Sequence, residues 1–84
     1  MAVRRVLVAG SYRQARKVGG FDPRDRSTVL ILTTDDARVC LGGIKGPTLL
    51  ETVGSPSPRL VKYVRELLER SGGYVFAGDF EAGN

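Results

Sequence analysis

The sequence contains no histidine, no tryptophan and a single cysteine among its 84 residues. It therefore offers too few nitrogen and sulfur ligands for a zinc site, and neither a Ser-His nor a Cys-His catalytic dyad can be built. The lone thiol forms no internal disulfide, which is consistent with a reducing compartment. Because Cys40 is flanked by Val39 and Leu41, we expect a buried structural thiol. The sequence thus predicts a non-catalytic protein without a metal or other cofactor.

Long hydrophobic runs are also absent. The longest, VLVA at 6–9 and VLIL at 29–32, fall far short of the roughly 18 residues that a membrane helix needs. The first residues, MAVRRVLVAGSY, lack the apolar region and the small-residue cleavage site of a secretory signal. We therefore expect a cytoplasmic protein. It should form one domain over residues 1–84 with a thin core, because folding at this size removes only about 60% of the accessible surface.

Acidic residues are scarce in the first third of the chain. The whole sequence has a net charge of +4, but residues 1–26 alone carry +5 and residues 27–84 carry −1. Such an asymmetry is typical of proteins with an anionic partner. Asparagine and glutamine are also rare, at one each, and arginine outnumbers lysine by ten to three. This composition favours a thermophilic source.

Several segments have the composition of β-strands, being rich in β-branched and apolar residues. They are residues 3–9, 27–34, 37–43, 48–53 and 74–80. Residues 48–53 are also compatible with a helix. The four consecutive apolar residues VLIL indicate that the second segment is buried on both faces of a sheet.

The second and third of these segments are predicted to pair as an antiparallel hairpin. Between them, Asp35 and Asp36 are typical turn residues, and a turn explains them better than a metal or acid-base pair does. Beyond the turn, Ala37, Val39 and Leu41 occupy alternate positions, as in a strand with one buried face.

One helix is strongly predicted, over residues 58–71. Ser57 is placed to act as its N-cap, and Pro58 follows at the first helical position, where no amide hydrogen is needed. Its side chains divide into an apolar arc and a charged arc at 100° per residue. The apolar arc comprises Leu60, Val61, Tyr63, Val64, Leu67 and Leu68. This arc must cover a sheet, because exposed charge pairs four residues apart stabilise a helix by only about 0.2–0.5 kcal/mol each.

A second, shorter helix is predicted over residues 11–18, with Ser11 as N-cap and Gly19 as its stop. A loop is the alternative. Together these elements predict an α+β fold with a four- or five-stranded mixed sheet and one main amphipathic helix, about 58–71, on one face. The strand, helix and strand at the end of the chain predict a closing β-α-β unit with parallel strands.

The strongest functional feature is the stretch SYRQARKVGGFDPRDR at 11–26, which places cations beside the aromatic residues Tyr12 and Phe21. Its basic residues are Arg13, Arg16, Lys17, Arg24 and Arg26. Guanidinium groups suit phosphate oxygens, and aromatic rings offer stacking surfaces for unpaired bases. The alternative interpretation is a solvated loop, in which Asp22 and Asp25 partly neutralise the arginines and the phenylalanine belongs to the core.

The glycine-rich loop GGIKGP at 42–47 contains a Gly-x-x-Gly motif with Lys45 inside it. Loops of this type clamp a nucleic-acid backbone in KH domains, where they join two helices. Here a predicted strand precedes the loop. A plain exit from the hairpin is therefore the favoured interpretation, and phosphate contact by Lys45 is the alternative.

The stretch PSPRLVKYVREL at 56–67 resembles the Brix domain of ribosome-biogenesis proteins. The residues that fit that family's pattern are Pro56, Ser57, Arg59, Tyr63, Arg65, Glu66 and Leu67. In that family the unit lies in an α+β domain that binds ribosomal RNA. The resemblance therefore implies RNA contact near Arg59.

These features predict a small basic domain that binds RNA through phosphate contacts, in ribosome assembly or RNA processing. The alternative is a protein-interaction subunit or homodimer that binds no nucleic acid. So thin a core gains from burial against a partner, and an unpaired strand at 37–43 offers an edge for strand addition.

Overall fold

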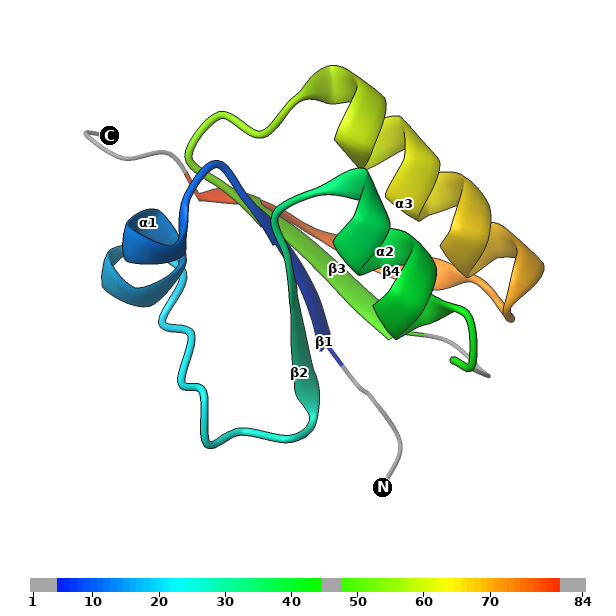
Figure 1. Ribbon diagram of the computed structural model, residues 1–84, viewed down its shortest axis with the longest axis horizontal. Helices are drawn as coiled ribbons and strands as arrows, with labels where there is room; N and C mark the ends of the chain where they lie inside the picture. Colours follow the sequence, from blue (N-terminus) through cyan, green and yellow to red (C-terminus); the bar gives the residue numbers. More distant parts are fainter. Residues whose placement is uncertain (1–4, 45–47, 81–84) are drawn as a thin grey trace.

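The computed structural model describes residues 5–44 and 48–80, and for residues 77–80 it describes the backbone alone. Strands and helices alternate along the chain (Figure 1). They are β1 (Arg5–Ala9), α1 (Tyr12–Lys17), β2 (Thr28–Ile31), α2 (Thr34–Leu41), β3 (Thr48–Val53), α3 (Pro58–Arg70) and β4 (Tyr74–Phe80). None of the helices in these ranges has the length and hydrophobicity needed to cross a bilayer.

The strands form one sheet in the order β2-β1-β3-β4, and every neighbouring pair is parallel. The register places Leu7 opposite Leu30 of β2 and Glu51 of β3. The general prediction of a small α and β fold around a four-stranded sheet is confirmed. The prediction of a mixed sheet is wrong, since no antiparallel pair occurs in the part of the chain that the structure describes.

The error arises at residues 34–41, which form the helix α2 and not the second strand of a hairpin. Thr33 and Asp36 form a capping box, in which the Thr33 hydroxyl accepts from the Asp36 amide and the Asp36 carboxylate accepts from the Thr33 amide. The turn residues are therefore a helix start. Ala37 and Leu41 are buried four residues apart, while Val39 is 75% exposed. A helical period fits this burial and a strand period does not.

The larger core lies between the sheet and the two helices α2 and α3, which cover the same face (Figure 1). Alternate strand residues point into it, including Val6 and Val8 of β1. The helices contribute Ala37, Leu41, Leu60, Val64 and Leu68. Of the predicted apolar arc of α3, only Leu60, Val64 and Leu68 are buried, and the rest is half-buried.

The smaller core lies on the opposite face, beneath α1. Leu7 and Ala9 point into it from β1, together with Val53 of β3 and Ala15 of α1. The four residues of VLVA in β1 are at most 1% exposed. The run buried on both faces is thus 6–9, at the centre of the sheet. The predicted run in β2 lies at the sheet edge, where Val29 and Leu30 are half-buried.

Cys40 is exposed on α2, so the prediction of a buried thiol is also wrong. That prediction depended on the alternating strand pattern of 37–43. In a helix, Cys40 follows the exposed Val39 and precedes the buried Leu41. Its position on the outer side of α2 follows from the same change of period.

Two adjacent leucines of β3 provide a matched test of this packing. Leu50 is fully buried in the larger core, whereas Leu49 faces the other side and is 38% exposed. We expect Leu50→Ala to lower the free energy of unfolding by about 2–5 kcal/mol, because it leaves a cavity, and Leu49→Ala to lower it by about 1 kcal/mol or less. Urea denaturation measures both. Equal losses would contradict the placement of the two faces.

Candidate functional site

Three cations gather on α1. Arg13, Arg16 and Lys17 are exposed and spaced i, i+3 and i+4, so they share one side of the helix. We call these three residues the basic α1 surface. In the part of the chain that the structure describes, none of them has an acidic side chain within ion-pair distance. These three cations therefore lie together on a helix face without an opposing carboxylate among the described residues.

The helix that carries this surface is held by its cap and by one buried residue. The Ser11 hydroxyl accepts from the Gln14 amide at 3.2 Å, and Ala15 packs against the sheet. Helix formation over 11–18, predicted with a loop as alternative, is confirmed with bounds of 12–17. Arg16 and Lys17 in the last turn also suit the negative end of the helix dipole.

Arg24 and Arg26 are exposed in the connection from α1 to β2, but carboxylates accompany them there. Asp22 accepts from the Arg24 amide at 2.9 Å. Hydrogen bonds from the hydroxyls of Ser27 and Thr28, and from the Ser27 amide, lower the pKa of Asp25 below its ordinary value of 3.8. Both carboxylates accept hydrogen bonds in turns of this connection, so two acidic side chains stand against its two arginines.

Arg5, the first residue of β1, is unavailable to a ligand. Its side chain donates to the carboxylate of Glu51, which is buried, and to the carbonyl oxygen of Gly19 at 2.6 Å. The ion pair joins β1 to β3 beneath α1 and fixes the chain after the helix. Among the N-terminal cations that the structure describes, the basic α1 surface is therefore the group without an opposing carboxylate.

Tyr12 begins α1 and is 44% exposed. Its ring meets Phe21 edge to face, with 6.1 Å between the ring centroids. Phe21 packs against the smaller core. Of the two aromatic residues predicted to stack on bases, Phe21 is therefore held in the core. Tyr12 remains accessible, beside the basic α1 surface.

The remaining predicted residues do not join this surface. Arg59 is exposed in the first turn of α3, which covers the opposite face of the sheet. Lys45 lies outside the described residues. The loop that holds it follows helix α2 and leads into β3, so the interpretation as a hairpin exit is wrong.

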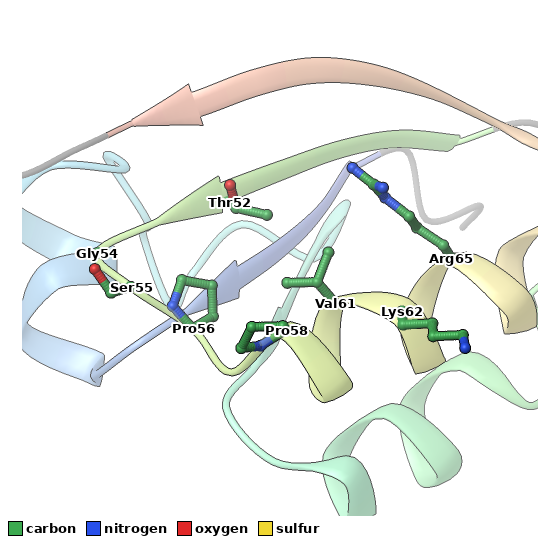
Figure 2. Close-up of a pocket in the computed structure, with 8 residues that line it drawn as sticks. All are labelled: Thr52, Gly54, Ser55, Pro56, Pro58, Val61, Lys62 and Arg65. Carbon is green, nitrogen blue, oxygen red and sulfur yellow. The ribbon is translucent and has the colours of Figure 1, made fainter.

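A second feature, which the sequence did not predict, is a cavity of about 430 Å³ where β3 leads into α3 (Figure 2). Its lining residues come from the end of β3, the following loop and one stripe of α3. They are Thr52, Gly54, Ser55, Pro56, Pro58, Val61, Lys62 and Arg65. The neighbouring strands β1 and β3 lead to helices on opposite faces of the sheet. Ligands of parallel sheets commonly bind at such a switch point, beyond the carboxyl ends of the strands, and the cavity adjoins it.

The cavity has a positive wall. Figure 2 shows the Arg65 side chain extending from α3 toward the strands, whereas Lys62 runs along the helix at the rim. The Arg65 guanidinium carbon lies 5.0 Å from the centre of the Phe76 ring. Its Nε–H is buried and has no hydrogen-bond partner among the described residues, an arrangement that costs about 1–3 kcal/mol when nothing compensates it. Neither cation has an ion-pair partner there.

A sequence signal for this cavity existed in the spacing of α3. Pro58, Val61, Lys62 and Arg65 stand at i, i+3, i+4 and i+7, which is one helical stripe. The division into an apolar and a charged arc placed Val61 in the core and the two cations in solvent. The stripe lies at the border between the two arcs. For this reason the division did not identify its residues as one group.

Neither location suggests a metal. No group of three or more Cys, Asp or Glu side chains in the described ranges is arranged to hold an ion. Comparisons of the chain with protein-family models, with curated proteins and with solved structures find no match.

The loop at the cavity depends on Gly54, which provides a test of this region. Gly54 has φ +71°, and a Cβ there would overlap the side-chain oxygen of Gln14 on α1. Gly20 has φ +67° with open space around it. Gly20→Ala should cost about 1–2 kcal/mol from backbone strain alone. Gly54→Ala should cost somewhat more, by about 0.5–1.5 kcal/mol, because the flexible end of the Gln14 side chain must turn away from the new Cβ.

Urea denaturation of both variants measures this difference. Adding Gln14→Ala to the Gly54→Ala variant, with Gln14→Ala alone as reference, should recover part of the excess loss. Equal losses for the two glycine variants would show that the loop after β3 does not contact α1 as described.

Proposed function

We propose that this chain is a small non-catalytic domain that binds single-stranded RNA through the basic α1 surface. The observation that supports this most is that Arg13, Arg16 and Lys17 have no acidic side chain within ion-pair distance among the residues that the structure describes. Three side chains on one helix face can contact successive phosphates without first breaking an internal ion pair. Tyr12 adds an accessible ring at the same helix, on which a base can stack.

The charges around α1 favour RNA contact at the helix itself and not along the whole N-terminal part of the chain. The connection after α1 is neutral overall, since Arg24 and Arg26 are balanced by Asp22 and Asp25. Its arginines therefore contribute less than those of the helix. A place in ribosome assembly or RNA processing is a further part of the proposal, and it rests on the resemblance of residues 56–67 to the Brix domain.

Binding should depend on salt in proportion to the number of phosphates contacted. For single strands, each neutralised phosphate contributes about 0.7 to the slope of log affinity against log salt. Three contacts predict a slope of about −2 for a fluorescent oligouridylate titrated between about 50 and 200 mM salt. Charge reversal of Arg13, Arg16 and Lys17 together should lower the affinity by about tenfold or more and flatten the slope.

The controls are charge reversals elsewhere on the same protein. Arg24→Glu with Arg26→Glu should weaken binding less than the α1 triple variant does. Arg70→Glu on α3 is matched to Arg16→Glu, as both residues are exposed in the last turn of a helix. If Arg70→Glu weakens binding as much as Arg16→Glu, the basic α1 surface is not the RNA site.

A protein-interaction module is the second candidate, and two exposed apolar residues favour it. Leu49 and Val75 lie opposite each other in the register of β3 and β4, and Val75 is 63% exposed. They share the face of α1, where no described helix covers them. β4 is also an edge strand, a common place for association. The edge strand predicted at 37–43 does not exist, so it no longer supports this candidate.

Light scattering after size exclusion separates the two candidates. The RNA-binding proposal predicts the mass of one chain, 9.1 kDa, over a range of protein concentrations. A dimer that Val75→Lys converts to a monomer, and that has no affinity for the oligouridylate, would favour the second candidate.

A further inference from the structure

We propose that the cavity between β3 and α3 binds a small molecule that carries a phosphomonoester on an apolar or flat body. This site is separate from the basic α1 surface, because α1 and α3 cover opposite faces of the sheet. A volume of about 430 Å³ falls in the range of about 300–1,000 Å³ that is usual for ligand pockets. The cavity therefore has room for more than an ion.

The charge of the lining selects an anion. Lys62 and Arg65 are its charged residues in the described part of the chain, and no acidic residue lines it there. A phosphomonoester carries about −1.5 to −2 charges at neutral pH, so it matches two cations better than a carboxylate does. Because a guanidinium presents a planar fork of donors, Arg65 is the residue expected to hold the phosphate oxygens.

The position of Arg65 supports this role. Its guanidinium stacks over Phe76, which fixes the group on the strand side of the cavity. Its Nε–H is buried without a described partner, so contact with a phosphate falls to the terminal NH2 groups of the guanidinium. Lys62 is exposed, and in Figure 2 its ammonium group points along α3 away from the prolines. Its flexible stem can turn to bring that group toward the same anion.

The amino end of α3 also favours the binding of an anion in the cavity. Ser57 occupies the N-cap position but makes no side-chain capping hydrogen bond, so the prediction of Ser57 as N-cap holds for its position only. The amino end of a helix of 13 residues thus faces the loop without a side-chain cap, and such an end attracts anions.

The rest of the lining is apolar and rigid. Pro56, Pro58 and Val61 present ring and methyl surfaces to the cavity. Prolines lose little conformational freedom when a ligand binds. These surfaces suit an aromatic or aliphatic body attached to the phosphate, and inorganic phosphate leaves them uncovered.

Phenyl phosphate is the probe, and titration into ¹⁵N-labelled protein followed by amide chemical shifts is the measurement. We expect saturable shifts at the loop and first turns of α3, in residues 54–65. Inorganic phosphate should bind at the same residues at least threefold more weakly, since it lacks the ring. Benzoate, which has the ring and a single negative charge, should also bind at least threefold more weakly.

Variants assign the contacts. Arg65→Gln should weaken phenyl phosphate binding about tenfold or more, as expected for the loss of a bidentate charged contact. Lys62→Gln, at an exposed position where the fold tolerates change, should weaken it about threefold. Arg70→Gln removes the same charge from the same helix outside the cavity and should leave binding unchanged. Charge reversal of the basic α1 surface should also leave it unchanged, so this test is independent of RNA binding.

Three results would overturn the proposal. Shifts that do not saturate, or that appear on α1 instead of residues 54–65, would show that the cavity takes no phosphate. Equal affinity for benzoate would show that phosphate is not the selected group. If Lys62→Gln and Arg70→Gln weaken phenyl phosphate binding equally, the weakening reflects the overall charge of the protein and not a contact in the cavity.

Discussion

The structure depends on the burial of β1 between two parallel neighbours. Its four apolar residues, VLVA at 6–9, are at most 1% exposed and alternate between the two cores. A parallel strand must be reached by a crossover, and the crossovers place helices on both faces of the sheet. In this chain α2 and α3 cover one face and the short α1 covers the other. The ion pair of Arg5 with Glu51 then secures the more lightly covered face.

This arrangement determines where ligands can reach the molecule. The carboxyl ends of the parallel strands lie at the same end of the sheet, so the loops that follow β1 and β3 lie side by side there (Figure 1). A Cβ on Gly10, after β1, would lie 3.2 Å from the amide nitrogen of Ser55, after β3. From this end of the sheet the two helices run over opposite faces. The two candidate sites thus present their cations in separate places, one on an open helix surface and one in a cavity lined with prolines.

Most of the helices and strands were predictable from the sequence. The predicted sheet topology was wrong because one segment, residues 37–43, was predicted to be a strand. Residues 37–43 fit a strand by alternation and a helix by the spacing of Ala37 and Leu41. The capping box of Thr33 and Asp36 favours the helix locally, and the exposure of Val39 in the folded chain agrees with it. A helix there makes the connection from β2 to β3 a crossover, which turns a mixed sheet into a parallel one. The basic α1 surface was predictable because one short helix carries it. For the cavity, the sequence shows only the stripe of α3 that lines it, because the cavity itself needs β3, α3 and their loop in their final positions.

The central claim is that the unopposed cations of α1 form the RNA-binding surface. The most direct measurement is a map of amide chemical shifts of the ¹⁵N-labelled protein as a single-stranded RNA is added. The account predicts that the perturbed amides concentrate in residues 11–18, with small effects in the connection to β2 and none along α2. Perturbations centred on α3, or the absence of any at α1, would contradict it.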